Sequence, residues 1–238
     1  MKAMIFAAGL GTRFKPWTDE HPKALAIINN KSLLQRNIEY LQRNGINEII
    51  VNVHHFADQV IEAIQTNNGW GSNIVISDER EMLLETGGGL LKAKELFKHD
   101  EPFLIINADI LTDLYIPDML SFHQQNGALI TLAISNRDSS RNLLFNQHNR
   151  LCGWENRNTG EQKIAIPHQK VRSMAYDCVA IFEPKIFELI TQQGKFSLTE
   201  TYLSLAPDYP ILGYQQHEGH FIDVGKPESV SIAEKMFP

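Results

Sequence analysis

The sequence predicts an α/β fold in which helices flank a mostly parallel, mixed sheet, with a small α+β extension at the C-terminal end. Two observations predict it. Short, continuous apolar runs alternate with longer amphipathic segments through the first half of the chain. Continuous apolar runs are typical of parallel strands that are covered on both faces, and strand–helix alternation implies right-handed βαβ units. The last third instead carries short paired runs, which favour added antiparallel strands.

The first half therefore reads as a Rossmann-like, doubly wound arrangement. The apolar runs predict strands at residues 2–7, 48–53, 73–77, 102–107 and 128–134. The amphipathic segments predict helices at residues 32–43, 56–66, 89–97 and 116–126. The first helix opens on the capping box Ser32-Leu33-Leu34-Gln35 and stops at Gly45.

The second half is expected to extend the same sheet. The pattern predicts a hairpin of residues 143–145 and 151–154, a strand at 176–182, a helix at 184–192, paired strands at 211–216 and 219–224, and a final helix at 227–236. No linker-like stretch separates this part from the first half. We therefore expect residues 1–238 to form a single domain.

Composition narrows the class of protein. The chain has 238 residues, with 22 Lys and Arg against 28 Asp and Glu, and a formal net charge of −6. A mildly acidic chain is not the pattern of a nucleic-acid binder. No run approaches the roughly 20 apolar residues that span a bilayer, and two cysteines make no disulfide framework. We expect a cytoplasmic protein that binds neither nucleic acid nor membrane.

The loop after the first predicted strand carries the most information. It reads Ala7-Ala8-Gly9-Leu10-Gly11-Thr12-Arg13-Phe14-Lys15-Pro16-Trp17-Thr18 and ends in Pro22-Lys23. Glycines allow backbone amides to approach a phosphate, and successive free amides form an anion-binding concavity. Arg13 and Lys23 add two cations to a loop that we expect to be lined by solvent. The alternative is a glycine turn beside a solvated basic patch.

Two common nucleotide motifs do not fit this loop. A dinucleotide fingerprint needs a third Gly or Ala where Phe14 stands, followed by a helix. Pro16 and Pro22 favour a long irregular loop instead. A P-loop would end in Gly-Lys-Ser or Gly-Lys-Thr, and this loop does not.

With three later motifs, the loop resembles the signature of the sugar-1-phosphate nucleotidyltransferases. The later motifs fall in the family's order: Glu85-Thr86-Gly87-Gly88-Gly89, Asn107-Ala108-Asp109 and Phe221-Ile222-Asp223-Val224-Gly225. The resemblance implies a GT-A-like nucleotidyltransferase fold, with a nucleotide-binding half at residues 1–135 and a sugar-binding half at 136–238. It also implies a Mg²⁺-dependent reaction of an NTP with a sugar 1-phosphate that yields a nucleotide-sugar and pyrophosphate.

The resemblance carries a set of expected site residues. The nucleotide would bind at Ala8, Gly9, Gly11, Thr12, Arg13, Gly87 and Gly88, with Arg13 and Lys23 as the catalytic cations. The metal ligands would be Asp109 and Asp223, and the acceptor would meet Asn107, Asn142 and Glu200.

Physical arguments support some of these roles and leave alternatives. Asp109 follows a predicted strand, where ligands of open α/β sheets bind, and Mg²⁺ prefers carboxylate oxygens; a strand-ending Asp also caps turns. Thr86 is a plausible N-cap, and the glycines after it leave room for a flat ring, although a plain helix-entry loop has the same composition. Glu200 also fits the third position of a helix capped by Ser197.

Substrate identity is the least determined property. The resemblance implies UTP and N-acetylmuramate 1-phosphate, whose acid group would need cations such as Arg141, Arg157 or Lys226. The chain departs from the family at Asn142, at Glu155-Asn156-Arg157 and at Lys226. Mannose, heptose or glucose 1-phosphates with GTP or CTP remain alternatives. So do a phosphocholine-type cytidylyltransferase, a glycosyltransferase and an inactive binding subunit, and the oligomeric state is not predicted.

Overall fold

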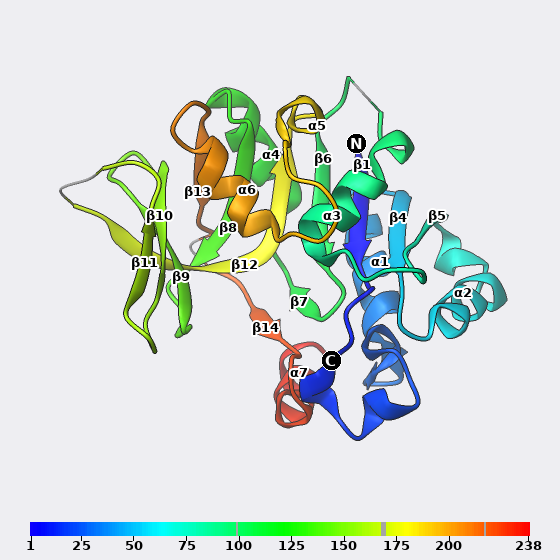
Figure 1. The fold of residues 1–238 in the computed structure, drawn as a ribbon. Coiled ribbons are helices and arrows are strands. Elements are labelled where there is room, and N and C mark those ends of the chain that lie inside the picture. The colour runs from blue at the N-terminus through cyan, green and yellow to red at the C-terminus, as the bar shows by residue number, and fades with distance from the viewer. Residues whose placement is uncertain (99, 168–169, 217) are drawn as a thin grey trace.

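The computed structural model describes residues 1–98, 100–167, 170–216 and 218–238 (Figure 1). In these ranges a mixed ten-stranded sheet forms the centre of the molecule. Its strands run in the order β11-β10-β9-β12-β6-β1-β4-β5, with β8 paired to β12 and β13 paired to β8. One sheet therefore extends through both halves of the chain.

The first half is parallel, as the apolar runs predict. Its strands are β1 (Lys2–Phe6), β4 (Glu48–Val53), β5 (Asn73–Asp78) and β6 (Phe103–Asn107). Its helices are α1 (Leu33–Arg43), α2 (Ala57–Thr66), α3 (Glu85–Lys92) and α4 (Ile116–Gln125). At the start of α1, the Ser32 hydroxyl accepts a hydrogen bond from the Gln35 amide at 3.1 Å. The Gln35 side chain donates to Glu39 instead of reaching back, so half of the predicted capping box forms.

The second half is mainly antiparallel. Its strands are β8 (Ile130–Ser135), β9 (Arg141–Phe145), β10 (Leu151–Asn156), β11 (Glu161–Ile164), β12 (Arg172–Phe182) and β13 (Ile211–Tyr214). The β9–β10 hairpin confirms the prediction. The strand predicted at residues 128–134 belongs to this half, because β8 runs antiparallel to β12 and parallel to β13. The strand β12 joins the halves by pairing with β6, β8 and β9.

One predicted pairing in the last third is wrong. The strand β14 (Phe221–Asp223) does not pair with β13 but with β7 (Ile110–Thr112), in a separate two-stranded sheet. A second small sheet joins β2 (Ile27–Ile28) to β3 (Lys31–Ser32). The β7–β14 pairing places Asp223 opposite Ile110, so it carries the C-terminal Asp back to the end of β6.

The remaining helices are short. The predicted helix at 184–192 is reduced to α5 (Ile186–Leu189), and the helix capped by Ser197 is α6 (Leu198–Leu205). The last helix, α7 (Val230–Met236), packs near β2 beside the first-loop segment (Figure 1). None of the helices in the described ranges is long and apolar enough to cross a membrane.

Alternate residues of each central strand enter two apolar layers. In β1, Ala3 and Ile5 pack into the layer covered by α1, α2 and α4, whereas Met4 and Phe6 pack into the layer covered by α3, α5 and α6. Burial on both faces explains why this strand reads as a continuous apolar run. The two layers leave the strand ends open, and polar residues gather there.

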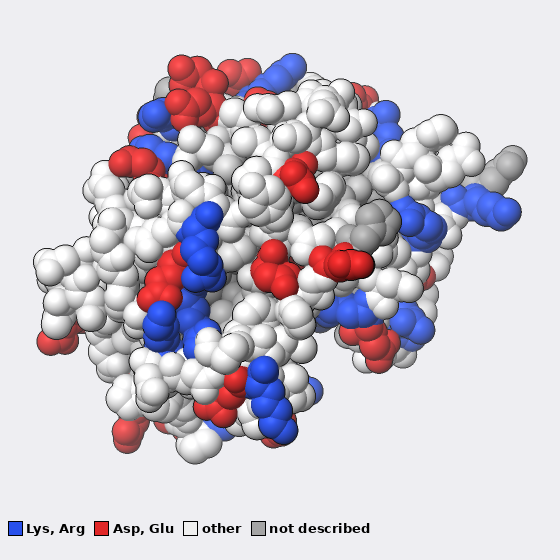
Figure 2. Space-filling model, turned by 180° about the vertical axis from the view of Figure 1, so that it is seen from behind, with Lys and Arg blue, Asp and Glu red and all other residues white. Residues whose placement is uncertain are grey.

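Charged side chains of both signs are mixed over the face in Figure 2. Blue Lys and Arg atoms lie beside red Asp and Glu atoms and do not form one continuous stripe on this face. This is the distribution of an ordinary solvated surface, so a candidate site is better sought in the cavities.

Candidate active site

A cavity of about 300 Å³ lies at the carboxyl ends of the parallel strands. It is bounded by the loop after β1, by the ends of β4, β5 and β6, and by the start of α3. Its polar lining includes Thr12, Arg13, Lys23, Asn52, Glu79, Glu85, Thr86, Asn107 and Asp109. Ligands of open α/β sheets bind at this edge, and the predicted phosphate loop forms one wall of the cavity.

The first loop is shaped by close contacts of its backbone. Gly11 has a φ of +61°, and a Cβ there would lie 2.8 Å from the Thr18 methyl and 3.0 Å from the Lys23 Cβ. Glycine is therefore required for both conformation and space. The chain continues through short 3₁₀ turns at Thr12–Phe14, Trp17–Asp19 and Lys23–Leu25, which confirms the predicted irregular loop.

Part of the predicted phosphate nest is already occupied. The amides of Ala7 and Ala8 donate to the Asn52 Oδ1 atom at 2.7 and 3.3 Å. Ala8 lines the cavity, but its amide is bonded to Asn52 and is not a free donor for phosphate; nucleotide binding at Ala8 stays a prediction. The amides of Gly9, Gly11 and Thr12 have no hydrogen-bond partner within the described ranges. The available donors thus lie nearer to Arg13.

Lys23 and Asp109 form an ion pair on the cavity wall. The Lys23 Nζ atom lies 2.5 Å from Asp109 Oδ2, and the Lys23 side chain is 11% exposed. The prediction that Lys23 faces solvent is therefore wrong, because the loop folds back over its side chain. Arg13 remains exposed at the cavity rim.

Asp223 joins this group through the β7–β14 pairing. The Val224 amide donates to the Asp109 carbonyl at 2.9 Å. A Cβ at Gly225 would lie 2.7 Å from Asp223 Oδ1 and 3.1 Å from Arg13 Nη2, so the glycine makes room for both groups. Four predicted site residues, Arg13, Lys23, Asp109 and Asp223, are thus brought together from distant parts of the chain.

The electrostatics of this group are those of crowded carboxylates. Burial and then the charge of Asp109 raise the pKa of Asp223, partly offset by Lys23, Arg13 and Arg137. Asp223 Oδ1 is buried without a hydrogen-bond partner in the described part of the chain. A bound cation would compensate both effects.

The donor set suits one kind of metal ion. No cluster of three or more His, Cys, Asp or Glu side chains occurs among the described residues. Two carboxylates alone do not make a zinc site, but Mg²⁺ binds through one or two carboxylates together with substrate phosphates and water. Asp109 and Asp223 therefore fit a Mg²⁺ ion that is held jointly with a nucleotide.

The opposite end of the cavity contains a buried amide–carboxyl pair that the sequence reasoning missed. Asn52 is the penultimate residue of β4, and Glu79 follows β5. The Asn52 Nδ2 atom donates to Glu79 Oε1 at 2.8 Å. Glu79 is fully buried, and its Oε2 atom has no partner among the described residues. The strand-end rule that singled out Asp109 would have found both residues.

Burial also sets the proton affinity of Glu79. Desolvation raises the pKa of its carboxyl, and the Asn52 hydrogen bond opposes this shift in part. The Glu79 carboxyl can thus present either an acceptor or a donor to a ligand at this end of the cavity.

Gly87 and Gly88 do not line this cavity. A Cβ at Gly87 would lie 2.3 Å from the Phe196 ring, and one at Gly88 would lie 2.1 Å from the Gly194 carbonyl oxygen. The amides of both glycines donate to the Phe196 carbonyl at 2.9 and 3.3 Å. The space on the Cβ side of both glycines is therefore filled by the protein itself, and nucleotide binding at Gly87 and Gly88 stays a prediction.

The predicted cap of α3 is also wrong. The helix begins at Glu85 with Leu84 in the cap position, and no side chain caps it. The Thr86 hydroxyl instead accepts a hydrogen bond from the Leu198 amide at 3.1 Å, which ties α3 to α6. Thr86 and Glu85 still line the cavity.

The three predicted acceptor residues lie apart. Asn107 lines the first cavity. Asn142 lines a second, open cavity of about 440 Å³, where its Nδ2 donates to Ser173 Oγ at 2.8 Å and its buried Oδ1 has no partner in the described ranges. Glu200 is exposed on α6 and is absent from the lining of the cavities described here. The structure does not bring Glu200 to the site.

Comparisons with known proteins agree with this geometry. Residues 2–143 match the family model described as nucleotidyl transferase. The N-acetylmuramate alpha-1-phosphate uridylyltransferase of Caulobacter vibrioides is 30% identical over 244 residues, covering 98% of this chain and 95% of that protein. The mannose-1-phosphate guanylyltransferase catalytic subunit beta of Dictyostelium discoideum is 28% identical over 232 residues, covering 96% of this chain. The chain spans 62% of that protein's length.

Solved structures show the same fold. The structure of HddC from Yersinia pseudotuberculosis complexed with GMP-PN has a TM-score of 0.78 at 23% identity, covering 100% of this chain and 99% of that chain. A UDP-glucose pyrophosphorylase complexed with UDP-glucose has a TM-score of 0.77 at 20% identity, covering 98% and 97%. With the first loop, the strand-end carboxylates and the matched family model in agreement, this chain belongs to the nucleotidyl transferase family of sugar-1-phosphate nucleotidyltransferases.

Proposed function

We propose that the protein transfers a nucleotidyl group from an NTP to a sugar 1-phosphate, with release of pyrophosphate and with Mg²⁺ as its cofactor. One observation carries the proposal. The glycine loop, its cations Arg13 and Lys23, and Asp109 line one cavity, and Asp223 lies close to Arg13 beside the cavity residue Gly225. Cations for phosphates beside carboxylates for Mg²⁺ are the groups that this reaction needs.

The reaction needs no covalent intermediate on the protein. A phosphate oxygen of the acceptor attacks the α-phosphorus of the NTP and forms the new P–O bond. The bond from the α-phosphorus to the bridging oxygen breaks, and pyrophosphate leaves with that electron pair. Catalysis then consists of positioning and charge neutralisation.

The described side chains divide this work by position. Arg13, exposed at the rim, stabilises the β- and γ-phosphates and the leaving pyrophosphate. Lys23, deeper and paired with Asp109, faces the reacting centre. Asp109 and Asp223 hold the metal ion, which when bound neutralises phosphate charge.

For the substrates, we propose UTP and N-acetylmuramate 1-phosphate. The support is the Caulobacter relative, which is named for this activity and is matched over 95% of its length. A second candidate is GTP with a mannose or heptose 1-phosphate. An ionised Glu79 offers only acceptors and would match the N1–H and N2–H₂ donors of guanine, whereas uracil presents one N–H between two carbonyls.

A substrate grid tests both proposals. The four NTPs and dTTP are each mixed with muramate, glucosamine, glucose, mannose and heptose 1-phosphates, and with phosphocholine, and pyrophosphate release is scored as kcat/KM. The expected best pair is UTP with N-acetylmuramate 1-phosphate. A best pair with GTP would favour the Glu79 argument. No pyrophosphate from any pair, with the Asp109→Asn variant as the blank, would refute the reaction itself.

A further inference from the structure

Arg137 is a cation on the acceptor side of the site that no sequence motif indicated. It follows β8 and lines the second cavity together with Asn142. Its Nε atom donates to Asp177 Oδ1 at 2.9 Å, and its Nη2 atom donates to the Tyr176 carbonyl at 2.8 Å. The guanidinium also lies 4.7 Å from the centre of the Phe221 ring. Three contacts therefore fix the side chain in one place.

An irregularity in β12 positions the groups that hold the Arg137 side chain. The register of β12 with β8 shifts between Tyr176 and Ala180, and Cys178 in this bulge has a φ of +55°. Positive φ is strained for a residue with a Cβ, and bulges re-aim side chains beside active sites. Here the bulge turns Asp177 and the Tyr176 carbonyl towards Arg137.

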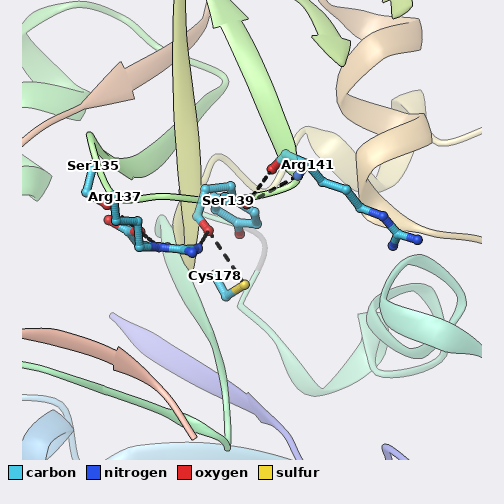
Figure 3. Close-up of polar contacts among 7 residues, drawn as sticks. Ser135, Arg137, Ser139, Arg141 and Cys178 are labelled. Atoms are coloured by element: carbon cyan, nitrogen blue, oxygen red, sulfur yellow. Dashed lines mark hydrogen bonds and ion pairs between the residues drawn. The ribbon is translucent and has the colours of Figure 1, made fainter. Parts of the chain in front are cut away.

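Asp177 itself is held firmly. Its side chain is 11% exposed, and its Oδ1 atom also accepts a hydrogen bond from Ser135 Oγ at 2.8 Å. In Figure 3, Arg137 extends towards the backbone beside Cys178, whereas Arg141 points away from this cluster. Arg141, named above as a cation for an acidic acceptor, thus lies outside it.

The guanidinium retains binding capacity. Of its five N–H donors, two serve Asp177 and Tyr176, and the others have no hydrogen-bond partner among the described residues. The side chain is 31% exposed, so a ligand can reach it from the second cavity.

Arg137 also acts electrostatically on Asp223. The positive charges that act on Asp223 come from Lys23, Arg13 and Arg137. The first two belong to the loop that we assign to the NTP. Arg137 is the member of this set that comes from the other half of the chain; it lines the second cavity and contacts Phe221, which lies on the same strand as Asp223.

We propose that Arg137 binds the phosphate of the acceptor sugar 1-phosphate through the free edge of its guanidinium, with Asp177 as its positioning residue. The inference rests on the proposed function, because it assumes an acceptor whose phosphate dianion binds beside the Mg²⁺ site at Asp109 and Asp223. The planar guanidinium can donate to two phosphate oxygens at once. A side chain that is already fixed in place loses little conformational freedom when the ligand binds.

Steady-state kinetics of Arg137→Ala test the proposal. The KM for the sugar 1-phosphate should rise roughly 10- to 100-fold, as expected for the loss of a charge-assisted hydrogen bond. The KM for the NTP should stay within about twofold. Arg137→Lys should recover part of the loss, because it keeps the charge and loses the fork. The matched control Arg172→Ala, at an exposed arginine of β12 that lines neither cavity, should change neither KM. Asp177→Asn should raise the acceptor KM less than Arg137→Ala does.

A binding measurement separates this proposal from the proposed function. With a non-hydrolysable NTP bound, inorganic phosphate should bind the wild-type protein more tightly than Arg137→Ala, whatever acceptor the protein uses. Equal phosphate binding by the two proteins would overturn the Arg137 proposal while leaving the reaction intact. So would equal rises in both KM values together with a lower melting temperature, which would mark a purely structural role. Absence of pyrophosphate release by the wild type would instead refute the proposed function.

Discussion

Replacing Gly87 by alanine should destabilise the protein without weakening nucleotide binding. The new Cβ would lie 2.3 Å from two carbons of the Phe196 ring and 2.9 Å from the Phe196 carbonyl oxygen. Ordinary carbon–carbon contacts are about 3.5–4.0 Å, so the ring would have to move by about 1 Å. Phe196 is 5% exposed and enclosed by its neighbours, so little room is available.

The magnitude follows from known overpacking costs. Small-to-large changes in a packed core cost about 1–3 kcal/mol. For a chain of this size each kcal/mol lowers the melting temperature by about 2–4 °C, so the expected decrease is roughly 2–12 °C. The KM for the NTP should change by less than about threefold, because Gly87 points away from the cavity and its amide bonds to Phe196.

Thermal unfolding and steady-state kinetics on the same samples measure both effects. Gly9→Ala is the matched control, because no atom lies within 4 Å of a Cβ at Gly9 and its φ is not positive. It should leave the melting temperature unchanged and raise the KM for the NTP, since the methyl group enters the phosphate loop. An unaltered melting temperature for Gly87→Ala with a large rise in KM would support Gly87 as a nucleotide contact and refute the packing argument.

Other variants separate the roles at the carboxylate edge. Asp109→Asn and Asp223→Asn should each lower Mg²⁺-dependent pyrophosphate release by roughly 10²-fold or more without unfolding the chain, and near wild-type turnover in both would contradict the metal assignment. Arg13→Ala and Lys23→Ala should each lower kcat by about 10²–10³, but only Lys23→Ala should also lower the melting temperature, since Lys23 is buried against Asp109. The raised pKa of Glu79 makes its contribution to stability fully present below its ordinary value of 4.5 and lost as pH rises through the folded-state value. Glu79→Gln should therefore reduce the decline in unfolding free energy as pH rises above 4.5 in urea titrations, and an unchanged decline would show that another group causes it.

The amino-acid sequence by itself determined the elements whose signals are local. The β1, β4, β5 and β6 strands read as apolar runs because both faces of the sheet are covered. The irregular course of the first loop was predicted correctly because glycine and proline positions constrain a short stretch of chain directly, whereas the burial of Lys23 was not predicted. Family membership followed from the order of such local motifs along the chain.

The tertiary structure decided everything that depends on a partner far along the chain. Gly87 and Gly88 are glycines because residues 194–196 pack on them. The sequence around position 87 contains no signal that these distant residues will be in contact with it. Asp223 reaches Asp109 only because β14 pairs with β7 instead of β13. Strand partners are chosen by the burial of whole faces, which a local pattern does not contain.

The least predictable feature was the fixed orientation of the Arg137 side chain. The residue precedes a hairpin in a polar segment that resembles any surface loop. Its fixed orientation requires the bulge at Cys178, the buried carboxylate of Asp177 and the Phe221 ring of another strand. A cation acquires a defined role when distant groups hold it against solvent, because an isolated arginine side chain has too many conformations to aim at one ligand.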